Sequence, residues 1–237
     1  MSDGWNESAD AWVASQGQGG DWSREYVLDA PMLARVRATV PANALDVGCG
    51  EGRFCRMLRD TGVAAIGVDP TAALLDTARR LDPTGDYRSG RAEGLDFAEA
   101  SFDLVVSYLT LIDIPDVRAA IAEMSRVLRP GGRLLIANLN SFTSAGMTLG
   151  WSDLTDGRRA YAFDDYLDEK AEEVAWQGIR ILNWHRPLST YMTLCLEQGL
   201  ILTHFDEPPA HGGDPQKIAR HRRAPWFVLM EWAKPPA

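Results

Sequence analysis

Residues 45–54, which read LDVGCGEGRF, combine residue types whose spacing could bind a nucleotide. A short apolar strand runs into three glycines, Gly48, Gly50 and Gly52, and a helix follows at once. Glycine permits positive φ angles and lets a ligand approach the backbone where no Cβ stands in the way. The first turn of the helix offers free N–H groups. The pattern predicts a nucleotide-type site at the carboxyl end of the first strand of a sheet.

Asp69 is the second residue in a position to do chemistry. It ends another apolar strand, residues 64–68, and follows Gly50 by 19 positions. A carboxylate there accepts hydrogen bonds from both hydroxyls of a ribose; the alternative is that Asp69 caps the next helix. The dinucleotide fingerprint G-x-G-x-x-G places its last glycine at position 53, where this chain has Arg53. The residues therefore favour a ribose site, with a nicotinamide dehydrogenase as the rival.

Alternating strands and helices are expected to position these residues. Strands are predicted over residues 44–47, 64–69, 87–89, 102–107 and 133–138, with helices over 53–60, 72–81, 117–128 and 187–198. Such alternation is typical of βαβ units and of a parallel sheet covered on both faces. Two late strands, residues 200–205 and 226–232, lack a full crossover helix between them and are expected to pair antiparallel.

Weaker patterns divide the rest of the chain. Residues 1–40 carry two helical patterns separated by residues 17–20, which predict an N-terminal helical cap. Residues 41–139 form the expected core, residues 140–182 an inserted lid over the substrate, and residues 183–237 the completion of the sheet. Together they are expected to make one domain.

Composition excludes several classes of protein. The formal net charge of −9 over 237 residues argues against nucleic-acid binding. No apolar run is long enough to span a bilayer and the first residues do not resemble a secretory signal, so we expect a cytoplasmic protein without membrane contact. Three cysteines without a CxxC spacing predict neither a disulfide framework nor a zinc site, and no other metal constellation is evident.

Four blocks in order give the chain a family resemblance. LDVGCGEGRF, IGVDP, SFDLVVS and MSRVLRPGGRLLIANLN cover residues 45–139. This stretch resembles the class I S-adenosylmethionine-dependent methyltransferases, in their small-molecule branch with a type 11/25-like domain. The resemblance implies an α/β fold with a Rossmann-like, doubly wound, seven-stranded sheet, mostly parallel with an antiparallel last strand and helices on both faces.

The resemblance also implies how S-adenosylmethionine would be held. Gly48 and Gly50 would pass under its methionine part, with Asp46 near the amino group. Asp69 would hold the ribose. The segment DWSR before the second helix would bring Arg24 to the methionine carboxylate as a bidentate fork, unless Arg24 is an ordinary surface residue. The full expected cofactor set is Arg24, Asp46, Gly48, Cys49, Gly50, Asp69, Pro70, Ala92, Glu93 and Ser107.

One position departs from the family pattern. The family commonly has an acid before the alanine that contacts adenine, and this chain has Arg91 there. The backbone N–H of Ala92 and the side chain of Glu93 remain as the expected adenine contacts.

The acceptor side is less defined. His185 could take a proton from a hydroxyl or amine as the methyl group arrives, or it could be structural. Tyr108 is placed beside the transferred methyl. Acceptor contacts are expected from Trp151, Tyr166, Trp184 and Arg186.

The expected function is direct in-line transfer of a methyl group to a small molecule, with S-adenosylhomocysteine as product, by a monomer or homodimer. Alternatives are a protein that binds S-adenosylmethionine without transfer, a nicotinamide-type dehydrogenase, and a protein or RNA methyltransferase. The sequence does not identify the acceptor or the atom that is methylated.

Overall fold

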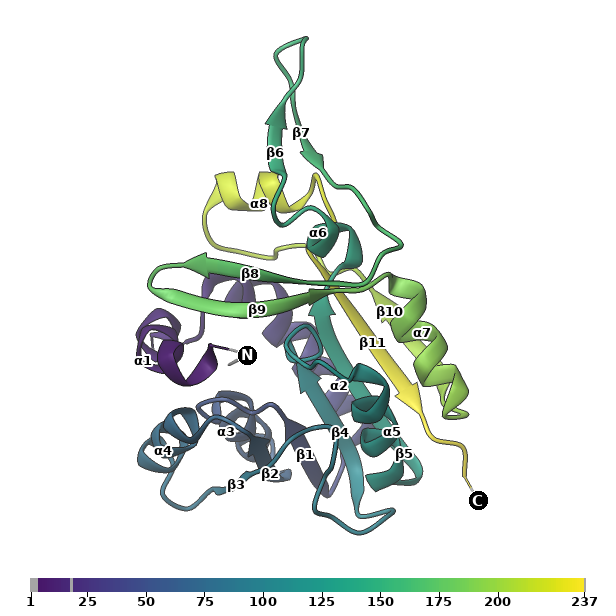
Figure 1. Ribbon diagram of the computed structural model, residues 1–237. Helices are drawn as coiled ribbons and strands as arrows, with labels where there is room; N and C mark the ends of the chain where they lie inside the picture. Colours follow the sequence, from purple (N-terminus) through teal and green to yellow (C-terminus); the bar gives the residue numbers. More distant parts are fainter. Residues whose placement is uncertain (1–3, 18, 237) are drawn as a thin grey trace.

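Seven strands form one sheet in the order β10-β11-β5-β4-β1-β2-β3 (Figure 1). The structure is a computed structural model that describes residues 4–17 and 19–236; the first three residues of the expected N-terminal cap, Gln18 of its loop and the last residue lie outside the described residues. The strands are β1 Asn43–Val47, β2 Ala64–Asp69, β3 Asp86–Ser89, β4 Phe102–Tyr108, β5 Leu128–Leu139, β10 Ile201–Asp206 and β11 Phe227–Ala233.

Strand directions confirm the predicted fold class. Strands β1 to β5 are mutually parallel, and β11 runs antiparallel to both of its neighbours, β5 and β10. The chain leaves β1 toward β2 on one side and returns to β4 on the other. In an open sheet of this kind, ligands bind outside the carboxyl ends of the strands where the order reverses. That edge lies between β1 and β4.

Helices cover both faces of the sheet, as the sequence predicts. One face packs against α5 Val117–Val127 and α7 Leu188–Glu197, and the other against α2 Asp29–Thr39, α3 Arg53–Asp60 and α4 Ala72–Leu81. The apolar stripe of α5 shows the cause: Ala120, Ile121 and Met124 recur at helical spacing and are fully buried. Asp116 accepts a hydrogen bond from Ala119 N at 3.0 Å and caps this helix.

The N-terminal segment begins with a helix that lies away from the sheet. It contains α1 Trp5–Gln16 and a π-helical turn, η1 Arg24–Leu28, which leads directly into α2. The two predicted helical patterns are confirmed, but the π-helical turn was not predicted. Helix α1 contacts β9 and α4 rather than the sheet. The hydroxyl of Ser8 ties it to the backbone of Arg180, donating to the carbonyl at 3.0 Å and accepting from the N–H at 2.9 Å.

Residues 140–187 contain structure that the sequence did not predict. After α6 Ser141–Ala145 come two antiparallel ribbons, β6 Gly150–Asp153 with β7 Arg159–Ala162, and β8 Lys170–Trp176 with β9 Ile179–His185. Strand β9 continues three residues beyond the expected end of the lid at residue 182. The β8–β9 ribbon crosses above the end of the sheet beside α1, while β6–β7 projects away (Figure 1).

A short helix, α8 Pro215–His221, follows β10 and was not predicted either. Asp214 caps it by accepting hydrogen bonds from Gln216 N and Lys217 N. Within residues 4–17 and 19–236, every helix is too short or too polar to cross a membrane.

Candidate functional site

The glycine turn between β1 and α3 has a backbone that only glycine adopts readily. Gly48 and Gly50 have φ angles of 78° and 55°. A Cβ on Gly48 would lie 2.1 Å from Thr110 Cγ2, so packing alone requires a glycine there. A Cβ on Gly50 would meet nothing within 4 Å. Packing therefore does not explain Gly50, and the turn leaves open space above its backbone for a ligand.

Asp69 braces this turn from the end of β2. Its carboxylate accepts hydrogen bonds from Gly50 N at 2.9 Å and from Thr71 N at 2.8 Å, and the residue is buried. Helix α4 begins after Thr71, so Asp69 is not its N-cap residue. A carboxylate can accept several hydrogen bonds, as binding of ribose hydroxyls requires. The use of Asp69 for a ribose stays a prediction.

Asp46 is the most unusual acid of the chain. It is 1% exposed, and Oδ2 accepts a long hydrogen bond of 3.4 Å from Cys55 Sγ. Within the described residues Oδ1 has no hydrogen-bond partner. Burial raises the pKa of Asp46 to about 7. The hydrogen bond from Cys55 opposes this rise, and the charges of Asp69 and Glu51 add to it. A buried carboxylate oxygen without a donor fits a ligand ammonium group.

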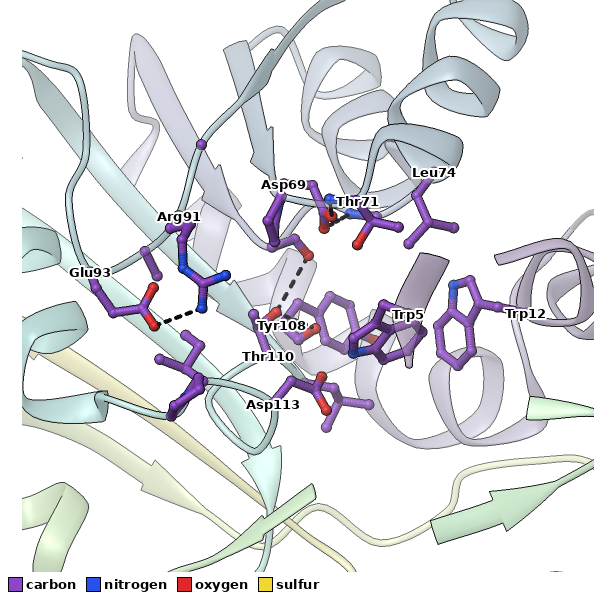
Figure 2. A pocket seen from close by; sticks show the side chains of 18 of the residues that line it. Trp5, Trp12, Asp69, Thr71, Leu74, Arg91, Glu93, Tyr108, Thr110 and Asp113 are labelled. Carbon is purple, nitrogen blue, oxygen red and sulfur yellow. Dashed lines mark hydrogen bonds and ion pairs between the residues drawn. The ribbon is translucent and has the colours of Figure 1, made fainter. Parts of the chain in front are cut away.

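Three adjoining cavities surround these groups. The strand-end pocket is lined by residues that follow β1, β2, β3 and β4 and by α1, among them Asp69, Pro70, Ala92 and Glu93 (Figure 2). The glycine-turn pocket is lined by Asp46, residues 48–51 and 53–54, and parts of the N-terminal segment and β4. The lid chamber lies beneath α6, β6–β9 and α8.

Two side chains line all three cavities, Trp12 and Arg24. The strand-end pocket and the lid chamber also share Trp5, Leu109 and Asp113. We call these five residues the shared wall. Leu109 has a φ angle of 57°, which is rare for a non-glycine residue and typical of strained functional loops.

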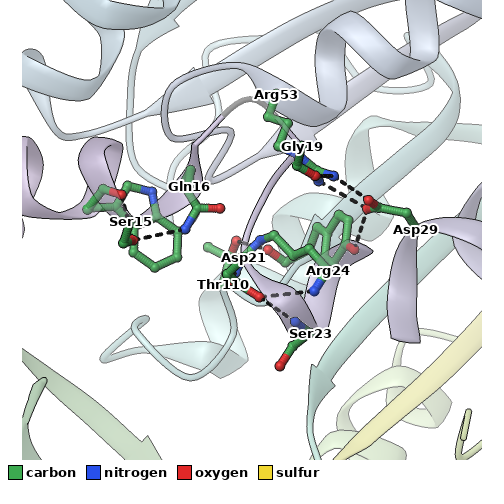
Figure 3. A network of polar contacts seen from close by, with 11 residues as sticks. Ser15, Gln16, Gly19, Asp21, Ser23, Arg24, Asp29, Arg53 and Thr110 are labelled. Atoms are coloured by element: carbon green, nitrogen blue, oxygen red, sulfur yellow. Dashed lines mark hydrogen bonds and ion pairs between the residues drawn. The ribbon is translucent and has the colours of Figure 1, made fainter. Parts of the chain in front are cut away.

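The guanidinium of Arg24 lies between two aromatic faces. It is 4.7 Å from the ring centre of Trp12 and 5.6 Å from that of Tyr108, and it forms an ion pair with Asp21 (Figure 3). The structure therefore brings Arg24 to the site as predicted. Its use for the methionine carboxylate stays a prediction, because Asp21 is its present partner.

The hydroxyl of Tyr108 donates to Asp29 Oδ1 at 2.8 Å, and Asp29 is also paired with Arg53. Burial, with the charge of Asp29, raises the pKa of Tyr108 well above its usual range. Tyr108 lines the strand-end and glycine-turn pockets, but its proton is held in this network. The geometry supports a wall residue rather than a proton acceptor.

Four of the other expected cofactor residues line a cavity, and one does not. Cys49 lines the glycine-turn pocket, while Pro70, Ala92 and Glu93 line the strand-end pocket, where Glu93 is paired with Arg91 at 3.2 Å. Ser107 is fully buried and lines none of the three cavities.

His185 lies outside the three cavities and is 2% exposed. Its Nε2–H donates to Tyr166 O at 3.0 Å, and its Nδ1 is hydrogen-bonded to the hydroxyl of Ser144 at 2.7 Å. Both ring nitrogens are therefore occupied by the protein. This geometry favours the structural alternative for His185, and a catalytic role stays an untested prediction.

Arg186 is bound by backbone groups of the protein. It is 1% exposed, and its guanidinium donates to the carbonyls of Leu111 at 3.1 Å, Ile114 at 2.7 Å and Pro115 at 2.9 Å. These contacts fix the loop after β4, which forms one side of the strand-end pocket. Arg186 acts on the pocket through this loop and does not reach into it.

Of the other expected acceptor residues, only Trp151 lines the lid chamber. The Tyr166 hydroxyl accepts from Leu188 N at 3.2 Å, and the Trp184 ring packs 4.8 Å from the Arg186 guanidinium. The sequence missed Trp5 and Trp12, whose rings meet edge to face at 5.3 Å. Their seven-residue spacing on one face of a predicted helix was an available signal. Among the residues that the structure describes, no three metal-ligating side chains gather.

Comparisons with known proteins agree with this geometry. Residues 45–136 match the family model of a methyltransferase domain. A malonyl-[acyl-carrier protein] O-methyltransferase of Enterobacter lignolyticus is 32% identical over 149 residues, which are 63% of this chain and 58% of that protein. A demethylmenaquinone methyltransferase of Paenarthrobacter aurescens is 27% identical over 233 residues, 89% of this chain and 85% of that protein.

Among solved structures, an S-adenosylmethionine-dependent methyltransferase from Mesorhizobium loti superposes with a TM-score of 0.74 at 26% identity, covering 84% of this chain and 96% of that one. The chain spans about half the length of the curated relatives that it matches at 32–34% identity. The matched domain contains the glycine turn, Asp69 and strands β1 to β4. Residues 45–136 therefore match a methyltransferase domain, and the chain has the fold of a solved S-adenosylmethionine-dependent methyltransferase.

Proposed function

We propose that this protein transfers the methyl group of S-adenosylmethionine to a small-molecule acceptor. The observation that carries the proposal is the shared wall. Trp12, Arg24 and Asp113 belong at once to the pocket at the strand ends and to the lid chamber. A cofactor in the first and an acceptor in the second would meet at this wall, as direct transfer requires.

The residues present fit the cofactor. Asp46 would bind the ammonium group through its unpaired Oδ1, and the open backbone at Gly50 would take the methionine part. Asp69 would bind the ribose hydroxyls. Pro70, Ala92 and Glu93 would flank the adenine at the far side of the strand-end pocket. Arg24 would bind the carboxylate if it shares its guanidinium between that group and Asp21.

The cofactor supplies a methyl group already activated by a positive sulfur. The protein's contribution is to position the acceptor in line and to exclude water. The ring faces of Trp12 and Tyr108, which now hold a guanidinium, suit a positive charge. No proton transfer through His185 or Tyr108 belongs to this proposal, because both are held by neighbouring protein groups.

The lid chamber favours a small acceptor. It is lined by residues of α1, the β8–β9 ribbon and α8. By their names, the two relatives act on a malonyl group carried by a protein and on a quinone precursor. The proposal includes a cytoplasmic enzyme that acts without nucleic acid, as a monomer or homodimer.

Calorimetric titration with S-adenosylmethionine, S-adenosylhomocysteine and NAD in parallel tests the cofactor. Binding of the first two and not of NAD is expected, and binding of NAD alone would overturn the proposal. Transfer of labelled methyl from S-adenosylmethionine to a panel of phenols, amines and carboxylic acids tests the reaction. Tight cofactor binding without transfer to any acceptor would favour a binding protein.

A further inference from the structure

The part of the lid chamber that α8 lines carries two cations without a carboxylate partner in the part of the chain that the structure describes. Lys217 and Arg220, on successive turns of α8, line the chamber and do not line the strand-end pocket. Lys217 Nζ lies 5.4 Å from the ring centre of Trp22, and the Arg220 guanidinium lies 5.0 Å from that of Trp226. Neither cation forms an ion pair with a carboxylate of the described chain. In a chain of net charge −9, two such cations facing one cavity need an explanation.

The acids that line the same chamber already have partners. Asp21 is paired with Arg24, and Glu173 is paired with Arg180 at 2.5 Å. Asp113 accepts a hydrogen bond from Asn183 Nδ2 at 2.6 Å. The cations and acids are thus not matched to each other across the chamber. The α8 end, defined by Lys217, Arg220, Trp22, Trp151 and Trp226, remains positive.

The aromatic walls hold these cations in place. The ring of His221 stacks on Trp226 at an interplanar angle of 25° and also meets Trp22, so α8 is anchored to the chamber. Arg220 lies 6.0 Å from the ring of Trp151 on the lid. An indole face attracts a cation but does not neutralise it, so the charge stays available to an anion.

Resting on the proposed function, we propose that the methyl acceptor carries an anionic group, a carboxylate or a phosphate, on a flat apolar body. Lys217 and Arg220 bind the anion at the α8 end, and the tryptophan rings contact the body. The atom to be methylated then lies toward the shared wall. The chamber's empty space is about 2050 Å³ with open solvent included, which accommodates both the anionic group and the apolar body.

Two probes of the same shape and different charge test this assignment. The negatively charged 2-naphthoate and the neutral 2-naphthamide are titrated into the protein saturated with S-adenosylhomocysteine, which blocks the cofactor site, and binding is followed by calorimetry. We expect 2-naphthoate to bind about tenfold more tightly, the size of one charge-assisted hydrogen bond. Comparison with 2-naphthyl phosphate shows which anion is preferred.

The double variant K217Q/R220Q should lose this preference and keep the affinity for 2-naphthamide. Both side chains are exposed, so the thermal midpoint should not fall. Arg222→Gln is the matched control, because Arg222 is the C-cap of α8 and does not line the chamber. Three outcomes would overturn the inference. The double variant could still prefer 2-naphthoate, the wild-type protein could bind the two probes equally, or it could bind neither.

Failure of this inference can be told from failure of the proposed function. Protein that binds S-adenosylhomocysteine but does not distinguish the probes refutes the anion site alone. Protein that distinguishes the probes through Lys217 and Arg220 without binding S-adenosylhomocysteine refutes the methyltransferase proposal and leaves the anion site. A third outcome is that neither probe binds, that an acidic carrier protein does, and that K217Q/R220Q abolishes this binding. That outcome would assign α8 to a macromolecular partner instead.

Discussion

Cofactor binding should release a proton from Asp46. Burial holds the pKa of this carboxyl at about 7 in the free protein, so near pH 7 about half of the molecules carry the proton. A ligand ammonium beside the unpaired Oδ1 would lower this pKa and drive the proton off. If only the ionised form binds, affinity for S-adenosylhomocysteine should rise about tenfold between about pH 6 and pH 8.

The same burial makes Asp46 costly for the free protein at neutral pH. The pKa of Asp46 in the folded protein lies above the reference value of 3.8. The contribution of Asp46 to the free energy of unfolding is therefore fully present below pH 3.8 and is lost as the pH rises toward 7. A shift of about three units corresponds to about 4 kcal/mol. Asp46→Asn removes this cost. It leaves a buried amide without a full set of hydrogen-bond partners, which destabilises the folded state by about 1–3 kcal/mol. The variant should therefore be the more stable protein near pH 8.

Calorimetry in two buffers of different ionisation enthalpy, such as phosphate and Tris, counts the protons. Near pH 7 the wild-type protein should release about half a proton per S-adenosylhomocysteine bound. Asp46→Asn should release none and should bind more weakly, while its urea midpoint near pH 8 rises. Buffer-independent binding by the wild type, or proton release retained by Asp46→Asn, would refute the assignment of Asp46 to the ligand ammonium.

The remaining predictions concern the turn, the ribose and the lid. Gly50→Ala should fold with a loss of about 1 kcal/mol, because only its φ angle is strained, yet lose cofactor affinity as its Cβ enters the open space. Gly48→Ala, whose Cβ would meet Thr110, should instead lose about 2 kcal/mol or more in urea unfolding; unchanged cofactor affinity in Gly50→Ala would count against the open backbone at Gly50. Asp69→Ala should weaken cofactor binding by about a hundredfold in titration, and unchanged affinity would remove it from the ribose site. His185→Ala should cost about 2 kcal/mol of stability with unchanged cofactor affinity, and a slower methyl transfer without loss of stability would restore the catalytic hypothesis.

The sheet and its helices could be predicted because their sequence signals are local. Helices α3 and α4 begin and end at the predicted residues, 53–60 and 72–81. Each lies between a buried apolar strand and a glycine or proline, so a change of period marks its boundaries. The antiparallel end strands followed from the lack of a crossover between them.

The ribbons of the lid could not be predicted in the same way. Along β8, residues 170–176 alternate only between exposed and half-buried positions, and none is buried in a core. Glutamates occupy positions that an apolar side chain would hold in a covered strand. This ribbon forms because β8 pairs with β9 and β9 contacts α1. The sequence of β8 itself does not alternate between apolar and polar residues, so it carries no strand signal.

The site residues show the same difference between local sequence signals and long-range packing. Asp46, Gly50 and Asp69 lie within one strand–turn–helix unit and its neighbour, so their spacing revealed them. Trp12 and Thr110 reach the site from separate elements, one from the N-terminal helix and one from the loop after β4. Their positions depend on how those elements pack, and sequence spacing carries no record of that.

The pair His185 and Arg186 shows why the role of a polar residue in an apolar setting is hard to predict from sequence. From sequence, an imidazole beside a guanidinium at the start of a helix suggests a pocket that handles protons and anions. Buried polar groups need partners wherever they lie, however, and here both side chains find them in backbone and hydroxyl groups. Arg186 satisfies three carbonyls of the loop that places Asp113 in the shared wall. The polar segment therefore serves the site by joining the lid to that loop, so that cofactor pocket and acceptor chamber keep one common wall.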